Sequence, residues 1–175
     1  MFIQRSRDLL FEKVDLLLAE LADLRTRGPH FRIHHRFRKP GTGCAPGEEI
    51  LAVCLVHRGR EYCLPLSLAL RILFDYLARH SRFRQSASQI ESGIRANRFY
   101  AQHGGAAMRK ESFTRSIPRS YVRVYIKRLW LALENAFGEA GLLVDTRSVL
   151  LSEKTVMNEI GYRLKATFDW MHIDV

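Results

Sequence analysis

Hydrophobic positions recur with heptad spacing over residues 6–27. The members of this seam are Leu10, Val14, Leu17, Leu21 and Leu24, alternately four and three residues apart. Gly28 and Pro29 follow and are typical of a helix end. The seam is short for a coiled coil, so the helix either dimerises or docks on its own domain. We therefore predict an amphipathic helix within residues 1–28, with a possible homodimer through residues 6–27.

The next segment alternates with period two, which is typical of a half-buried strand. In "HFRIHHRFR" the side chains of Phe31, Ile33, His35 and Phe37 share one face, and basic residues share the other. The runs "EILAVCLV" and "EYCLPL" predict two further strands joined by a turn at "HRGR". Together they predict a small antiparallel sheet. We expect the basic strand face of Arg32, Arg36 and Arg38 to be solvated rather than bound to DNA.

Helical spacing begins after Ser67, the expected N-cap of a helix marked by Leu68, Ile72, Leu73, Tyr76 and Leu77. A shorter helix is predicted over about residues 86–94, with Ser86 as its cap. A long basic connection over residues 96–118 leads to Pro118, a residue suited to a first helical turn. The β-like runs "RSVLLS" and "GYRLKATFDWMHID" near the end predict a hairpin.

The segment from about residue 118 to 137 predicts one helix with two different faces. Its apolar stripe consists of Val122, Ile126, Leu129, Leu133 and Ala136. On a neighbouring stripe Arg119, Arg123 and Lys127 follow one another at four-residue spacing. Like charges at this spacing repel each other, so a purely structural helix gains nothing from them. The pattern favours an anionic partner, although an ordinary solvated helix face is the simpler alternative.

Charge strengthens this interpretation. The formal net charge is +10, and residues 95–130 hold nine Lys or Arg against one Asp or Glu. A basic block of this kind is typical of proteins that bind a polyanion.

Cysteine usage and the remaining motifs exclude several classes. Cys44, Cys54 and Cys63 are odd in number and form no CxxC pair, so we expect no disulfide framework and interpret them as buried structural cysteines. Cys54, His57 and Cys63 offer only three ligands, which disfavours a zinc site. No catalytic or cofactor motif occurs, and no apolar stretch is long enough to span a membrane or to act as a leader. We predict a cytoplasmic protein that is not an enzyme, needs no cofactor and contacts no membrane.

Two motifs in this order resemble the winged-helix DNA-binding domain of OmpR/PhoB-type response regulators. In "YVRVYIKRLWLALENAFGEAGL" the family's recognition-helix pattern is matched by Val122, Val124, Ile126, Arg128, Leu129 and Leu133. In "TVMNEIGYRL" the end of the wing is matched by Thr155, Val156, Gly161, Tyr162, Arg163 and Leu164. The resemblance covers about residues 58–166. It departs from the family at Leu70, where a glutamate is usual, and at Met157, Asn158 and Glu159, which replace Val-Arg-Gly. Residues 1–57 show no βα alternation, so we expect no phosphoacceptor receiver domain.

The resemblance implies an α+β fold over residues 29–175: a winged helix-turn-helix with an N-terminal antiparallel sheet and a C-terminal β-hairpin wing. It further implies sequence-specific binding of double-stranded DNA by the helix over about residues 118–137 in the major groove, as in a transcriptional regulator. The predicted DNA-binding residues are Arg115, Arg119, Ser120, Arg123, Val124, Lys127, Arg128, Asn158 and Arg163. In this interpretation Arg123 reads bases and Arg128 clamps a phosphate. For Arg163 an outward-facing strand residue is the equal alternative. The loop over residues 96–118 occupies the place where relatives of this type contact RNA polymerase, and contact with DNA is the equal alternative for it.

Two other classes stay open. A winged helix that serves as a protein-interaction or assembly module is favoured by the altered wing and disfavoured by the basic block. RNA binding is suggested by "FRIHHRF", which mixes aromatic residues and cations, but the deep groove of A-form RNA excludes a helix.

Overall fold

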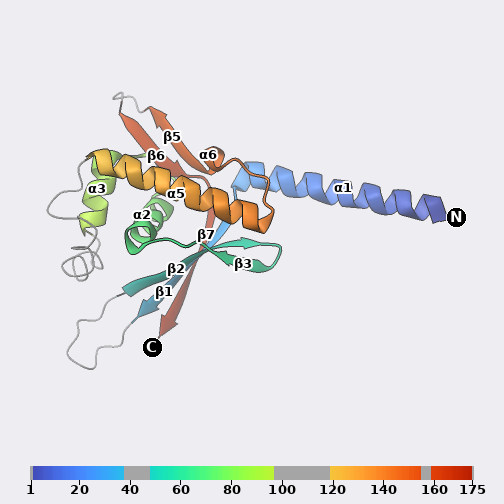
Figure 1. The fold of residues 1–175 in the computed structure, drawn as a ribbon, viewed down its shortest axis with the longest axis horizontal. Coiled ribbons are helices and arrows are strands. Elements are labelled where there is room, and N and C mark those ends of the chain that lie inside the picture. Colours follow the sequence, from blue (N-terminus) through green and yellow to red (C-terminus); the bar gives the residue numbers. More distant parts are fainter. Residues whose placement is uncertain (1, 38–47, 97–118, 155–158, 175) are drawn as a thin grey trace.

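The computed structural model describes residues 2–37, 48–96, 119–154 and 159–174 (Figure 1). These residues form an α+β fold with two sheets. The helices are α1 (Phe2–Arg27), α2 (Leu68–Arg79), α3 (Ala87–Ala96), α5 (Arg119–Ala140) and the short α6 (Thr146–Val149). The strands are β1 (His30–Phe37), β2 (Glu48–His57), β3 (Arg60–Cys63), β4 (Gln85–Ser86), β5 (Leu150–Lys154), β6 (Ile160–Leu164) and β7 (Thr167–Asp174).

The larger sheet has the strand order β3-β2-β1-β7. Its three N-terminal strands pair antiparallel, as the alternation predicted. Phe31, Ile33 and His35 are buried on the inner face, which confirms the predicted apolar side of β1. On the other face Arg32, His34 and Arg36 are only partly exposed, so this side is less solvated than we expected.

Strand β7 corrects the prediction of a purely antiparallel N-terminal sheet. β7 pairs parallel with β1, from Thr167 beside His30 to Asp174 beside Phe37, so the sheet is mixed (Figure 1). The prediction failed because parallel pairing joins segments far apart in sequence, and no local pattern records it.

The C-terminal run that looked like one hairpin arm is two strands. β6 pairs with β5 in the predicted hairpin and ends at Leu164. The chain then crosses to the larger sheet, where the Thr167 amide donates to the Pro29 carbonyl at 3.0 Å. The "RSV" predicted as strand is instead the helix α6, whose first turn is capped by the Asp145 carboxylate at the Arg147 amide.

The smaller sheet has the order β4-β6-β5, and α2, α3 and α5 lie against it (Figure 1). Helix α2 starts after Ser67 as predicted, although the Ser67 side chain makes no capping hydrogen bond. Ser86 does cap α3: its Oγ accepts from the Gln89 amide, and Gln89 Oε1 accepts from the Ser86 amide. One hydrophobic core joins these helices to both sheets.

A buried carboxylate connects α2 to two strands of the larger sheet. Asp75 is 3% exposed. Its oxygens lie 3.4 Å from His35 Nε2, 2.8 Å from Arg79 Nε and 3.1 Å from Trp170 Nε1. Burial raises the pKa of Asp75, but the contact with His35 and the hydrogen bonds and charge around it outweigh burial, so the pKa lies below its usual value. These three partners come from β1, α2 and β7 and hold the sheet to the helix.

Helix α1 ends at Arg27, directly before Gly28, as predicted, and extends away from the rest of the chain (Figure 1). Gly28 has φ of +75°, and its amide donates to the Leu24 carbonyl at 2.9 Å, the usual arrangement at a helix C-terminus. Leu24 packs partly against the core, whereas Leu10, Val14 and Leu17 of the seam are 63%, 49% and 48% exposed. The seam is therefore docked only at its C-terminal end.

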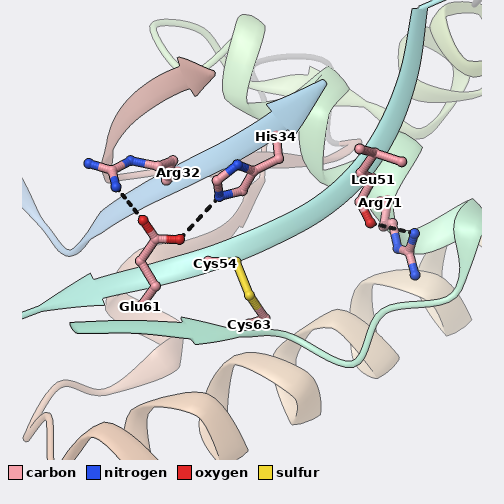
Figure 2. The surroundings of a disulfide bond; sticks show 7 residues. All are labelled: Arg32, His34, Leu51, Cys54, Glu61, Cys63 and Arg71. Carbon is pink, nitrogen blue, oxygen red and sulfur yellow. Dashed lines mark hydrogen bonds and ion pairs between the residues drawn. A yellow bond between two sulfur atoms is a disulfide. The ribbon is translucent and has the colours of Figure 1, made fainter. Parts of the chain in front are cut away.

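The structure contains a disulfide that the sequence analysis did not predict, between Cys54 of β2 and Cys63 of β3 (Figure 2). The two residues are directly paired in the hairpin, with Cα atoms 3.9 Å apart. An odd number of cysteines excludes a complete framework but not a single pair, and the third cysteine, Cys44, lies outside the described residues. Nearby, the Arg71 guanidinium donates to the carbonyls of Leu51 and Leu66 and holds α2 to β2.

Gly28→Ala should destabilise the protein. The left-handed conformation costs a residue with a Cβ about 1–2 kcal/mol, and an added Cβ would lie 2.2 Å from the Lys165 carbonyl oxygen. Thermal unfolding should show a clear fall in Tm. Gly138→Ala in α5 is the control, because an added Cβ there meets nothing within 4 Å and alanine favours a helix. Equal effects of the two changes would contradict this account of Gly28.

Asp75→Asn should lower the free energy of unfolding at neutral pH by about 1.5–3 kcal/mol, the range for lost hydrogen bonds to a charged group. The depressed pKa of Asp75 stabilises the fold above the unfolded value of about 3.9, and this stabilisation is lost as pH falls through the folded pKa. Urea unfolding between pH 7 and pH 3 should therefore show the two proteins converging at acid pH. Asp169→Asn, at a half-exposed carboxylate, should change little; a constant gap for Asp75→Asn down to pH 3 would refute the ionised state.

Candidate nucleic-acid interface

Helix α5 buries the apolar stripe that its sequence predicted. Val122, Ile126, Leu129, Leu133 and Ala136 are at most 3% exposed. Tyr125 and Phe137 extend this buried face. The side chains pack into the common core, and α5 contacts α2 and α3. The indole Nε1 of Trp130 donates to the Leu150 carbonyl at 2.9 Å and so fixes α5 relative to the hairpin.

This packing leaves a basic surface on the N-terminal half of α5. Arg123, Val124, Lys127 and Arg128 are exposed, and Val124 is 46% exposed. Farther along the helix the exposed charges are acidic, at Glu134 and Glu139. We call Arg123, Val124, Lys127 and Arg128 the basic face of α5. The charge changes sign along the helix, so an anion would be attracted to its N-terminal half.

Two aromatic rings position arginines at this face. The Arg128 guanidinium lies 5.8 Å from the centre of the Tyr125 ring, a cation–π distance. Burial raises the pKa of the Tyr162 phenol, and the charge of Arg123 and a hydrogen bond from it lower that pKa in part. Arg123 thus lies beside β6, and Arg128 lies over a ring of its own helix.

The predicted site residues divide into three groups. Arg123, Val124, Lys127 and Arg128 lie together on the exposed side of α5. Arg119 and Ser120 begin the same helix, but their side chains lie outside the described part of the structure, as do the residues Arg115 and Asn158. The predicted polymerase-contacting loop also lies almost wholly outside it.

Arg163 does not join the basic face. It alternates in β6 with Tyr162 and Leu164, whose side chains are buried toward the helices. By strand alternation Arg163 projects from the opposite side of the smaller sheet, and it is partly buried there. This geometry favours a role in the sheet over a contact with whatever α5 binds.

Sequence reasoning missed a second polar cluster, on the outer face of the larger sheet. There His34 Nε2 lies 3.1 Å from Glu61 Oε2, and Arg32 pairs with the other oxygen of Glu61 (Figure 2). Cys54 lies beside them, whereas His57, which we had grouped with the cysteines, lies near Glu20 of α1. The turn at "HRGR" is the part of the sequence from which this cluster could have been predicted. Arg58 and Gly59 both have positive φ in a two-residue hairpin loop, which sets Cys54 opposite Cys63 and Glu61 opposite Val56.

Comparison with known proteins identifies no relative: no family model, curated protein or solved structure matches the chain. Among the helices of the described residues, none is both long enough and apolar enough to cross a membrane.

Proposed function

We propose that the protein binds double-stranded DNA sequence-specifically by placing the N-terminal half of α5 in the major groove, as a winged-helix transcriptional regulator does. The observation that carries the proposal is the basic face of α5, exposed on a helix whose opposite side is completely buried. An α-helix fits the major groove, and side chains from successive turns reach base edges or phosphates there.

The arrangement around α5 supports a winged helix. Helices α2 and α3 precede α5, the hairpin of β5 and β6 follows it, and β4 completes a three-stranded sheet. In this reading α5 is the recognition helix, and the hairpin that ends in Tyr162 and Leu164 is the wing.

In this proposal the residues of the basic face make different kinds of contact with DNA. Arg123 can donate two hydrogen bonds to guanine O6 and N7, which discriminates by about 1–3 kcal/mol against another base. Val124 offers a methyl surface to thymine. Lys127, one turn farther, and Arg128, over the Tyr125 ring, contact phosphates. Phosphate contacts position the helix, and base contacts specify the sequence.

A protein-interaction module is the second candidate. It is favoured by Leu131, which is 52% exposed just beyond the basic face, and by the acidic side chains that follow. The candidates differ in salt dependence: DNA affinity falls steeply with salt because phosphate contacts release counterions, whereas apolar association changes little.

Arg123→Glu should abolish most DNA affinity, and Lys127→Glu should weaken binding to all sequences. Fluorescence anisotropy of mixed-sequence duplexes at low and moderate salt would measure both. Arg60→Glu is the control, because it makes the same change in net charge at an exposed residue outside the basic face. Its strand, β3, lies near the C-terminal half of α5 (Figure 1), so this variant should retain binding. Equal losses in Arg60→Glu and Arg123→Glu would leave only nonspecific charge attraction, and no binding of the wild type at low salt would refute the proposal.

The exposed seam of α1 supports a homodimer, in which two copies pack Leu10, Val14 and Leu17 against each other. Two-fold symmetry would then pair two recognition helices with two half-sites in the DNA. Leu17→Glu should place charges in the seam and yield monomers in sedimentation experiments, with the core unaffected. Leu18→Glu, which changes an exposed leucine of the same helix that lies outside the seam, is the control. A wild-type chain that sediments as a monomer at high concentration would contradict the dimer.

A further inference from the structure

The outer face of the larger sheet brings together three side chains that are metal ligands by type. His34 comes from β1, Cys54 from β2 and Glu61 from β3. Their ligand atoms all lie within 4.8 Å of one another. Figure 2 shows His34 and Glu61 turned toward each other beside the disulfide of Cys54. The three strands are hydrogen-bonded neighbours, so the positions are set by sheet register rather than by a loop.

We propose that His34, Cys54 and Glu61 form a zinc site when the disulfide of Cys54 and Cys63 is reduced. Imidazole nitrogen, thiolate sulfur and carboxylate oxygen are the ligands that Zn²⁺ uses, at about 2.0–2.3 Å. Ligand atoms this close need only side-chain adjustment to reach one ion. Three protein ligands leave a fourth position for water or for the freed Cys63 thiolate.

The ligands are prepared for a cation. The Glu61 carboxylate already accepts a hydrogen bond from the Arg32 guanidinium and lies 3.1 Å from His34 Nε2. The cation that now pairs with Glu61, Arg32, has a second carboxylate nearby: its Nη2 lies 3.9 Å from Asp169 Oδ2. Arg32 can therefore keep a counterion when Glu61 turns to the metal.

The disulfide decides whether the site exists. In the oxidised chain the sulfur of Cys54 is bonded to Cys63 and is not a thiolate. A dithiol reductant supplies two electrons and two protons, forming two thiols while it becomes a disulfide itself. Zn²⁺ then displaces the proton of the Cys54 thiol into solvent, together with the proton that His34 Nε2 holds against Glu61. Reducing compartments keep thiols in this form, so the metal form would prevail there and the disulfide form under oxidation.

The test is a zinc titration of the full chain against a chromophoric chelator, with and without a dithiol reductant. Cys44→Ser serves as the background so that only the paired cysteines contribute thiols. The reduced protein should bind one Zn²⁺ per chain. The oxidised protein should bind zinc more than about tenfold more weakly, because even the loss of a residue that only orients a metal ligand lowers metal affinity by about tenfold. Co²⁺ in place of zinc should give thiolate-to-metal absorption only after reduction.

Two cysteine variants make the test specific, because both break the same disulfide. Cys63→Ser should bind zinc even without reductant, since Cys54 is then permanently free. Cys54→Ser should bind weakly under both conditions. Any folding cost of the lost disulfide is shared by the pair and is checked by circular dichroism and thermal unfolding.

His34→Ala provides the matched histidine test, with His30→Ala as its control. His30 lies on the same strand and face and also contacts a carboxylate, Asp169 at 2.9 Å, but it is not in the ligand cluster. Zinc affinity should fall in His34→Ala and persist in His30→Ala. Equal affinities in these two variants, or no zinc bound by the reduced protein, would overturn the proposal and leave an ordinary ion-pair cluster.

Discussion

The parallel pairing of β1 with β7 is the contact on which the rest of the structure depends. It joins the strand that follows α1 to the last strand of the chain, so the elements between them are enclosed by one long-range closure (Figure 1). Bringing two such distant segments together lowers the conformational entropy of the chain, and this loss precedes the favourable free energy of their pairing. The Asp75 carboxylate of α2 offsets part of this cost, because it contacts His35 of β1 and accepts a hydrogen bond from Trp170 of β7. One buried charge therefore holds the sheet, the helix and the closure together.

The position of α5 follows from this closure. Its apolar stripe is one wall of the core that both sheets share, and Trp130 ties it to the first residue of β5. Because the apolar stripe of α5 is buried in the core, the residues on the opposite side of the helix are exposed to solvent. Their charges run from basic to acidic along the helix, so the attraction for an anion is concentrated in the first half of α5. The proposed contacts with DNA are therefore made by the basic face of α5, whose side chains do not pack in the core.

A two-residue turn has a comparable influence on the larger sheet. The positive φ angles of Arg58 and Gly59 set the pairing of β2 with β3, and the pairing puts Cys63 opposite Cys54. The same register puts Glu61 near His34 across two strands. The disulfide and the proposed metal site both depend on the hairpin of β2 and β3. They exclude each other, because the sulfur of Cys54 cannot bind a metal as a thiolate while it is bonded to Cys63.

The local elements could be derived from the sequence because short-range patterns encode them. The end of α1 at Gly28, the alternation of β1, the cap at Ser86 and the buried stripe of α5 each depend on residues within a few positions of one another. The same holds for the exposed basic face of α5, which is the complement of its apolar stripe. The contacts of its side chains with DNA stay a prediction. Tertiary structure alone decided the partner of β7, the outward position of Arg163, the neighbours of Cys54 and the uncovered seam of α1. These depend on which distant segments meet, and the free energy of such meetings lies in burial and pairing that no local period records.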